Sequence, residues 1–307
     1  MFEDPANETA ERHRKQGTEP EAPDFAFDPD DSWTQTFQAG LERADLKGKT
    51  VYEVGVGTGV NLAFILRTCG AARAYGSDLD PRLVMLAERN LRSLSPQHAE
   101  HFEPVHGSVS LIDTDDARSK ITKTDVVIAC IPQVGEPNDL RLTAFRKAQS
   151  VELPDGAETQ AEDHIAHYYP WTAFDEYPYN SVGLGLNEAL LRRIRQHAPK
   201  AQVVMNFGCR IGSDIIFECF EANGYRPEKL ASKIVHQHVG TDISFFVALE
   251  KALCGTDLEK QLVCKFYADP DGTHPLSATD AQRLIEKDPH VDLYHEVSVI
   301  RGIPIEN

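Results

Sequence analysis

The sequence lacks long apolar runs and blocks of basic residues, and each absence excludes a class of protein. No apolar run reaches about 18 residues, the length that a membrane-spanning helix requires. Aspartate and glutamate outnumber lysine and arginine by 48 to 31, and the formal net charge is −17. Proteins that bind nucleic acid or anionic membranes normally present a basic face. We therefore expect a small-molecule substrate, and neither nucleic acid nor a membrane as a partner.

Paired cysteines and an apolar leader are also missing. The six cysteines form no C-x-x-C pair and no zinc-finger spacing, and several lie in apolar runs as ordinary small hydrophobic residues. The first residues, MFEDPANETAERHRK, are charged and lack the apolar core of a signal peptide. These features favour a cytoplasmic protein in a reducing compartment. His106, His236 and His238 lack the spacing of metal ligands, so we predict no metal site.

A glycine-rich turn between a predicted strand and a predicted helix is the strongest signal in the chain. Val51–Val54 is a short apolar run suited to a buried parallel strand. Gly55, Gly57 and Gly59 follow at once, and the apolar spacing over Leu62–Cys69 is helical. Glycines allow the backbone to approach a ligand closely and to turn into a helix without a Cβ clash. The pattern predicts a ligand-binding loop.

An acidic residue completes this βαβ unit. The next predicted strand, Ala72–Gly76, leads into Asp78 and Asp80. A carboxylate at this position can accept hydrogen bonds from both hydroxyls of a ribose, so we assign that role to Asp78 and keep Asp80 as the alternative. Val60 stands where the dinucleotide fingerprint G-x-G-x-x-G has its third glycine, so no pyrophosphate is expected. The unit predicts an adenosine ligand; the alternative is a turn that binds nothing.

With Glu53 before the loop, the pattern E-x-G-x-G-x-G followed by G-x-D-x-D resembles motifs I and II of class I S-adenosylmethionine (SAM) methyltransferases. The resemblance implies SAM as cofactor and a Rossmann-like, doubly wound α/β sheet. That sheet is mostly parallel and closes with an antiparallel C-terminal hairpin. The residues that we expect at the cofactor are Glu53, Gly55, Gly57, Gly59, Asp78, Leu79, Ser108, Cys130 and Thr36.

The remaining elements follow from periodicity and turn signals. We predict helices at 37–46, 81–91, 184–197, 214–223 and 278–286, strands at 104–109, 124–130 and 201–207, and an antiparallel hairpin of 234–238 with 243–249. The runs LVCKFYA and YHEVSVI near the C-terminus are also strand-like. The predicted organisation is a loose N-terminal arm at 1–30, a methyltransferase domain at 31–252 with a substrate lid at 135–180, and an α+β extension at 253–307 packed on the same domain.

Four further motifs narrow the resemblance. They are Cys130-Ile-Pro-Gln133, Gly183-Leu-Gly-Leu186, Asn206-Phe-Gly-Cys-Arg210 and Thr241-Asp-Ile-Ser244. In this order they resemble the N-terminal region of plant methionine S-methyltransferases and, in total length, the free-standing bacterial enzymes of dimethylsulfoniopropionate synthesis. The likeness covers roughly residues 30–300. It implies transfer of a methyl group from SAM to the thioether sulfur of L-methionine, giving S-methylmethionine and S-adenosylhomocysteine as the first step of such a pathway.

This reaction requires no general base, because a thioether sulfur has a lone pair and no proton to lose. We therefore expect no catalytic acid or base, only positioning of the reacting atoms. Arg210 is the candidate for the substrate carboxylate and Asp242 for its ammonium, while aromatic faces can stabilise a sulfonium. An ion pair for Arg210 and a turn cap for Asp242 are the alternatives. The expected substrate residues are Ile131, Pro132, Tyr168, Tyr169, Trp171, Tyr177, Tyr179, Asn206, Arg210 and Asp242.

Two other functions remain open at this point. One is an N-methyltransferase acting on a protein or nucleic-acid amide or amine, and the other is a catalytically silent SAM-binding module. Related nitrogen methyltransferases end the fourth strand in (N/D)-P-P-(Y/F), which accepts a hydrogen bond from the amine. Here Cys130-Ile-Pro-Gln133 takes that place, which counts against an amine substrate. A homodimer is one open expectation for the oligomeric state.

Overall fold

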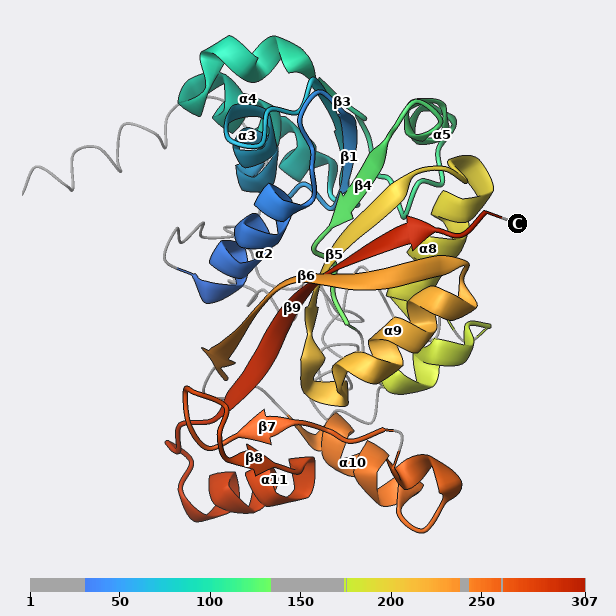
Figure 1. Ribbon diagram of the computed structural model, residues 1–307. Coiled ribbons are helices and arrows are strands. Elements are labelled where there is room, and N and C mark those ends of the chain that lie inside the picture. Colours follow the sequence, from blue (N-terminus) through green and yellow to red (C-terminus); the bar gives the residue numbers. More distant parts are fainter. Residues whose placement is uncertain (1–30, 134–173, 175, 238–242, 261, 307) are drawn as a thin grey trace, which may run out of the picture.

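The computed structural model describes residues 31–133, 174, 176–237, 243–260 and 262–306 (Figure 1). A single sheet runs through the centre of this part of the chain. Its strands are β1 (Thr50–Val54), β2 (Arg73–Ser77), β3 (Phe102–Pro104), β4 (Val126–Ala129), β5 (Gln202–Gly208), β6 (Tyr225–His236), β7 (Phe266–Tyr267), β8 (Pro275–Leu276) and β9 (Tyr294–Pro304). They lie in the order β3-β2-β1-β4-β5-β9-β7-β8, and β6 pairs with β9.

The N-terminal half of the sheet is parallel, as predicted. β1 pairs with β2 and β4, β3 pairs with β2, and β4 pairs with β5, all in parallel. These strands are short apolar runs buried on both faces, which is typical of a parallel sheet between two helical layers. The predicted third strand at 104–109 is wrong, because β3 ends at Pro104 and the chain turns at Gly107, whose φ of 92° is left-handed.

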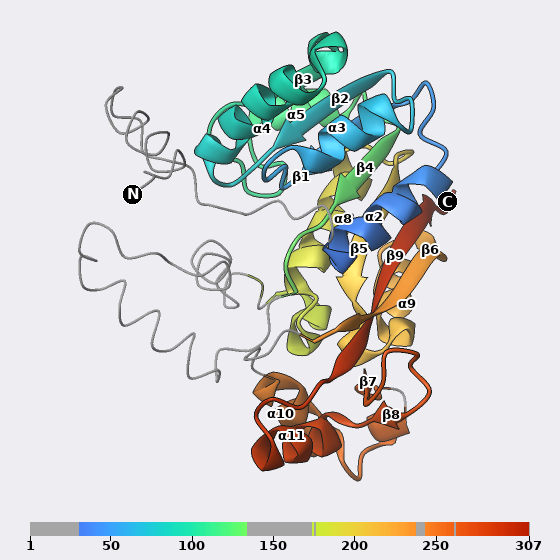
Figure 2. The same cartoon turned by 90° about the vertical axis from the view of Figure 1, so that its left-hand side faces the viewer.

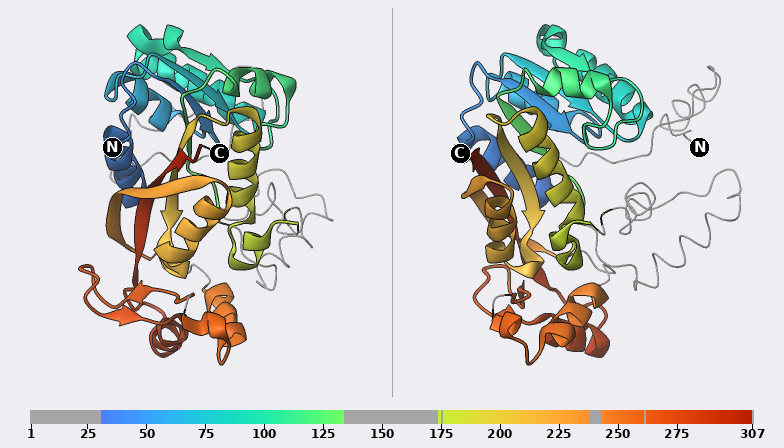
Figure 3. Two further views of the ribbon diagram at one scale, coloured as in Figure 1. Left: turned by 45° about the vertical axis from the view of Figure 1, so that its right-hand side comes forward. Right: turned by 90° about the vertical axis from the view of Figure 1, so that its right-hand side faces the viewer.

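Helices cover both faces of this sheet (Figure 3). Buried side chains of α2 (Ser32–Arg43), α3 (Val60–Arg67) and α4 (Pro81–Leu94) form one apolar layer, and those of α5 (Asp115–Ile121), α8 (Gly185–His197) and α9 (Ser213–Ala222) form the other. The prediction of a doubly wound α/β fold is therefore confirmed. None of the helices in the described part of the chain combines the length and apolar composition needed to span a bilayer.

The antiparallel end of the sheet differs from the prediction in its second strand. Residues 243–249 were expected to pair with 234–238, but they begin the helix α10 (Ser244–Leu253). Their apolar side chains at Phe246, Leu249 and Leu253 have helical spacing and pack against the core. The strand that pairs with β6 is β9, and β9 also pairs antiparallel with β5.

The predicted extension at 253–307 therefore contributes a strand to the central sheet. β9 lies between β5 and β6, while η5 (Asp257–Lys260), β7, β8 and α11 (Ala278–Lys287) lie with α10 beyond the end of β6 (Figure 1). Only Phe266–Tyr267 of the run LVCKFYA is a strand. The predicted arm at 1–30 and most of the predicted lid at 135–180 fall outside the described residues.

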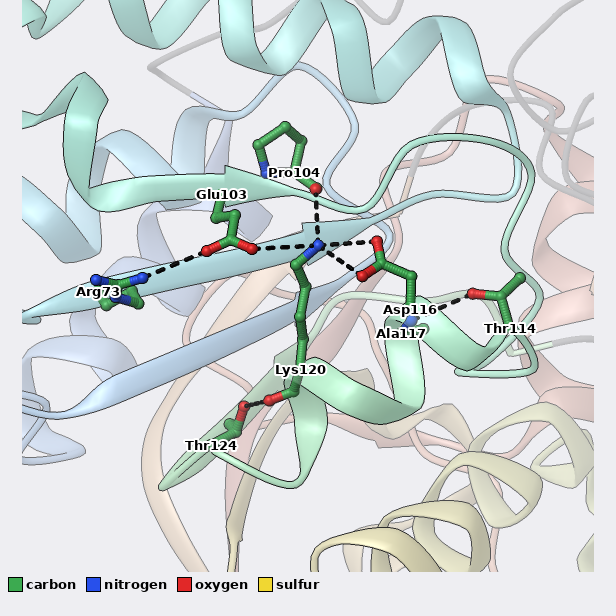
Figure 4. A network of polar contacts seen from close by, with 8 residues as sticks. All are labelled: Arg73, Glu103, Pro104, Thr114, Asp116, Ala117, Lys120 and Thr124. Atoms are coloured by element: carbon green, nitrogen blue, oxygen red, sulfur yellow. Dashed lines mark hydrogen bonds and ion pairs between the residues drawn. The ribbon is translucent and has the colours of Figure 1, made fainter.

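A cationic side chain ties the outer strand to the helical layer at the edge of the sheet (Figure 4). The Nζ atom of Lys120, on α5, lies 2.8 and 2.9 Å from the two carboxylate oxygens of Asp116 and 3.3 Å from the carbonyl oxygen of Pro104. It also lies 3.4 Å from Glu103, which in turn pairs with Arg73. The Lys120 side chain is 9% exposed, whereas its two carboxylate partners are about half exposed. Lys120 is thus buried and paired, and it holds α5 against β3.

Replacing Lys120 with methionine should destabilise the protein by about 1–3 kcal/mol, because two carboxylates and a carbonyl lose a shared buried partner. Partial hydration of the half-exposed carboxylates keeps the loss below that of a fully buried pair. Urea unfolding of Lys120→Met, with exposed Lys123→Met as the matched control, measures the difference. Equal midpoints for the two variants would contradict the role assigned to Lys120.

Candidate functional site

The loop between β1 and α3 has a backbone that only glycine adopts without strain. Gly55, Gly57 and Gly59 have φ angles of 76°, 50° and 81°. A Cβ atom on Gly59 would lie 2.8 Å from the Cα atom of Ala87, so this glycine also lets the start of α3 approach α4. The predicted glycine loop is present at the carboxyl end of β1, where parallel sheets of this type bind ligands.

The two acidic residues after β2 have different surroundings. One carboxylate oxygen of Asp78 accepts a hydrogen bond from the Gly57 backbone N–H at 3.0 Å, and the other accepts from the Asp80 N–H at 3.0 Å. Asp80 caps α4 and is ion-paired with Arg82. Burial raises the pKa of Asp78, while its backbone hydrogen bonds lower it. Asp78 therefore faces the glycine loop, as the first of the two sequence assignments requires.

Glu53 is a fully buried carboxylic acid beneath the loop. One of its oxygens accepts a hydrogen bond from the side-chain amide of Asn61 at 3.1 Å, and the other oxygen has no partner within the described residues. Burial raises its pKa to about 8, the hydrogen bond from Asn61 opposes this rise, and the charge of Asp78 adds to it. An unpartnered buried carboxylate oxygen beside a glycine loop fits a cationic ligand group, such as the ammonium of SAM.

Polar side chains continue from Glu53 across one face of the sheet. Glu53, Cys130 and Asn206 lie on neighbouring strands or their ends, since Ile128 pairs with Glu53 and Met205 pairs with Ala129. The Asn206 side-chain amide donates to the Cys130 sulfur at 3.7 Å and to the Trp33 carbonyl at 3.5 Å. α2 lies over this face of the sheet (Figure 2). We call Glu53, Cys130 and Asn206 the polar row.

Beyond the polar row, the ends of β5 and β6 bring further polar groups together. The Gly208 backbone N–H donates to the Gln133 side-chain oxygen at 2.9 Å. Arg210 donates from Nε to the Gln237 side-chain oxygen at 2.7 Å. The Arg210 guanidinium carbon also lies 5.9 Å from the centre of the Trp33 ring, within cation–π range. Arg210 thus lies at the carboxyl edge of the sheet, where we predicted it.

Three other residues predicted at the cofactor lie around the same edge. Leu79 follows Asp78 directly, and Ser108 is exposed next to Val109, whose N–H donates to the Asp78 carbonyl at 3.0 Å. Thr36 is buried in α2, and its hydroxyl donates to the Ser32 carbonyl at 2.7 Å. Their contacts with a cofactor stay predictions.

The loop after β4 is held on both sides. Ile131 is buried, and its Cγ2 atom lies 3.4 Å from the position that a Cβ on Gly55 would take. The Pro132 carbonyl accepts a hydrogen bond from the Asn187 side chain at 3.1 Å. This loop therefore contacts both the glycine loop and the start of α8. The assignment of Ile131 and Pro132 to the substrate stays a prediction.

The two tyrosines of the predicted lid that the structure describes lie against the outer helices. The Tyr177 ring lies 5.2 Å from the Arg192 guanidinium carbon of α8, and the Tyr179 backbone N–H donates to Glu188 at 2.9 Å. Tyr179 also lines an apolar cavity of about 280 Å³ with residues of α9 and α10. Their role as substrate walls stays a prediction. Tyr168, Tyr169, Trp171 and Asp242 lie outside the described residues.

Histidines in the described part of the chain form no metal-binding cluster. His106 is exposed, and His236 lies 2.9 Å from the Asp292 carboxylate. Sequence reasoning missed two buried residues at the carboxyl edge, Gln237 and His295. No motif marks either of them, because their positions depend on how β6 and β9 pair.

Comparisons with known proteins agree with this geometry. Residues 32–132 match the family model of ribosomal protein L11 methyltransferase (PrmA). A methionine S-methyltransferase from Zea mays is 27% identical over 287 residues, which cover 89% of this chain and 24% of that enzyme. A methionine S-methyltransferase from Wollastonia biflora is 29% identical over 240 residues, which cover 73% and 21%. A ribosomal protein L11 methyltransferase from Aliivibrio fischeri is 34% identical over 133 residues, which cover 42% and 40%.

The chain is a SAM-dependent methyltransferase. It spans about a quarter of the length of the methionine S-methyltransferases that it matches. The predicted cofactor is therefore confirmed, whereas the assignment of the glycine loop, Asp78 and Glu53 to that cofactor stays a prediction.

Replacing Asp78 with asparagine should weaken S-adenosylhomocysteine binding by about 1–3 kcal/mol, because a charged acceptor next to the glycine loop is lost. Calorimetry measures the affinity, and the exposed Asp113→Asn variant is the control. If Asp80→Asn weakens binding and Asp78→Asn does not, the two acids have been assigned the wrong way round.

The Glu53→Gln variant should be more stable than the wild type at high pH and should bind S-adenosylhomocysteine more weakly. The pKa of Glu53 is about 8 in the folded protein and about 4.5 as an ordinary glutamate, so the folded state binds the proton more tightly. Wild-type stability therefore falls as pH rises from about 4.5 to 8, and glutamine removes that loss. Thermal unfolding of both proteins at pH 5 and pH 8.5 tests this, and a difference that does not grow with pH would contradict it.

Proposed function

We propose that this methyltransferase transfers the methyl group of SAM to the thioether sulfur of L-methionine, giving S-methylmethionine and S-adenosylhomocysteine. The observation that carries the proposal is how much of the chain each kind of relative covers. The maize methionine S-methyltransferase matches 89% of this chain, whereas the L11 methyltransferase of Aliivibrio matches 42%. The L11 family model also ends at residue 132, before β5, β6 and β9. Similarity to the methionine enzymes thus extends into the part of the chain that lies beyond the cofactor loop.

The chemistry of the carboxyl edge supports a thioether nucleophile. Cys130, Ile131 and Pro132 follow β4 and supply no side-chain amide or carboxylate oxygen as an acceptor for a substrate N–H. Asn206 directs its amide nitrogen toward Cys130, so its oxygen is the acceptor that remains at the end of the polar row farthest from Glu53. A sulfur nucleophile has no proton to donate, and an apolar loop end of this kind suits it.

The residues at this edge also support a reaction without a general base. SAM, when bound, supplies a methyl group on a positively charged sulfur, and the charge passes to the methionine sulfur with no proton transferred. The chain then has to hold the reactants in line and tolerate a cation. Glu53 supplies a carboxylate beneath the loop, and the Trp33 ring lies beside the edge. His295 is buried, and its pKa is lowered to about 2, mainly by burial, so it stays neutral at ordinary pH.

The finer proposals follow from the same resemblance. The product S-methylmethionine would enter a dimethylsulfoniopropionate pathway as its first intermediate, and the enzyme would act in the cytoplasm on a free amino acid. The second candidate is methylation of a ribosomal protein. The family-model match over residues 32–132 and the 34% identity to an L11 methyltransferase over 133 residues favour it. The chain's net charge of −17 disfavours RNA as a substrate. It counts less against a basic ribosomal protein.

Purified protein with labelled SAM and L-methionine should yield labelled S-methylmethionine, and Asp78→Ala should abolish most of this turnover. At saturating substrates, kcat should show no limb near the pKa of histidine, because no histidine has to accept a proton. Parallel reactions with ribosomal protein and RNA test the second candidate. Label in the protein and none in methionine would overturn the proposal, and a histidine-dependent limb in kcat would contradict the mechanism.

A further inference from the structure

Three polar side chains at the carboxyl edge are buried and incompletely hydrogen-bonded. Asn206, Gln237 and His295 are 2%, 5% and 1% exposed. Within the described residues, the Asn206 side-chain oxygen, the Gln237 side-chain nitrogen and both ring nitrogens of His295 have no hydrogen-bond partner. Buried polar groups are nearly always paired in native proteins, and an unpaired one lowers stability. A group of them at the edge where the cofactor loop lies indicates a polar ligand.

These three residues come from separate parts of the chain and meet through the pairing of β5, β6 and β9. Asn206 lies near the end of β5, whereas His295 lies at the start of β9 and pairs with Val235 of β6. The Gln237 backbone N–H continues the ladder by donating to Leu293. Trp33 links them, because its carbonyl accepts from Asn206 and its ring lies 5.7 Å from the His295 ring. Figure 2 shows α2, which carries Trp33, lying over β5 and β9.

The existing hydrogen bonds determine which atoms remain available. Asn206 uses its amide nitrogen toward Trp33 and Cys130, which leaves the oxygen as an acceptor. Gln237 uses its oxygen to accept from Arg210 at 2.7 Å, which leaves the nitrogen as a donor. A neutral histidine offers one donor and one acceptor. The cluster therefore presents donors and acceptors together, with a guanidinium adjoining it and without a carboxylate of its own.

We propose that Asn206, Gln237 and His295 form the subsite that binds the α-ammonium and α-carboxylate groups of an amino-acid substrate. The donors of Gln237 and His295 match a carboxylate, which Arg210 also attracts, and the Asn206 oxygen matches an ammonium. Cys130 adjoins Asn206 on the cofactor side, so a side-chain sulfur would extend from this subsite toward the glycine loop. The assignment of the amino acid as methionine rests on the proposed function.

The test compares three thioethers: L-methionine, 3-methylthiopropylamine, which lacks the carboxylate, and 4-methylthiobutanoate, which lacks the ammonium. Wild-type kcat/KM should favour L-methionine by about 100-fold or more. The His295→Leu variant should lose at least about tenfold for L-methionine and much less for the amine, because leucine fills the space without either nitrogen. The matched control is His236→Leu, since His236 is exposed and pairs with Asp292.

The Gln237→Glu variant separates recognition from structure. It keeps the oxygen that accepts from Arg210 and replaces the unpartnered donor with a negatively charged oxygen. Turnover of both carboxylate-bearing thioethers should fall at least about tenfold, while turnover of 3-methylthiopropylamine is retained. Equal losses for all three substrates in both variants would mean a structural role only and would overturn the proposal.

Two measurements keep the result independent of folding and of the proposed function. S-Adenosylhomocysteine affinity should be unchanged in both variants, and the unfolding midpoint of His295→Leu should not fall, because the change removes two unpartnered buried nitrogens. A fall in both would overturn the proposal in favour of a structural role.

If the wild type does not methylate L-methionine, the proposed function fails. Calorimetry then tests the subsite by itself. It measures the binding of L-methionine and of L-alanine, each with S-adenosylhomocysteine present. Binding weakened by His295→Leu supports the subsite, and no binding of either amino acid to the wild type overturns it.

Discussion

Desolvation of polar groups on one face of an otherwise apolar sheet is the constraint on which the site depends. Glu53 is buried completely, and the burial raises its pKa to about 8. Asn206 is also buried, on β5, and it lies next to Cys130, an exposed residue that follows β4. These side chains occupy positions that apolar residues would fill in a sheet built for stability alone. The protein tolerates them because apolar layers on both faces of the sheet supply the burial that holds the strands in register.

The insertion of β9 between β5 and β6 joins the two halves of the site. A strand from the C-terminal end of the chain pairs antiparallel with both neighbours and places His295 near Arg210 and Trp33. The elements from α10 to α11 lie between β6 and β9 in sequence and pack beyond the carboxyl edge. Residues that are far apart in the chain therefore lie together at the carboxyl edge, in the proposed substrate subsite.

The comparisons divide the chain in the same place. The L11 family model covers 32–132, which contains the glycine loop, Asp78 and the end of β4. These are the parts that any methyltransferase of this class needs to hold its cofactor. The longer matches to methionine S-methyltransferases extend beyond them, into strands whose ends carry Asn206, Arg210 and Gln237. Most of the residues proposed for the substrate therefore lie C-terminal to the part of the chain that the L11 family model covers.

Local pattern determined the cofactor side of this protein. A short apolar run, three glycines, a helical repeat and Asp78 are close in sequence, and each rests on backbone geometry or periodicity that neighbouring residues decide among themselves. The sequence left either Asp78 or Asp80 as the candidate for the ribose. The structure favours Asp78, because Asp80 is ion-paired with Arg82. The tertiary structure alone decided that residues 244–253 are a helix and that β9 pairs with β6. A strand-like run gives no sign of its partner, because pairing over such a distance depends on the burial available in the whole sheet. Gln237 and His295 could not be predicted from the sequence for the same reason. Their unpartnered side-chain atoms come close to one another only through the pairing of β5, β6 and β9.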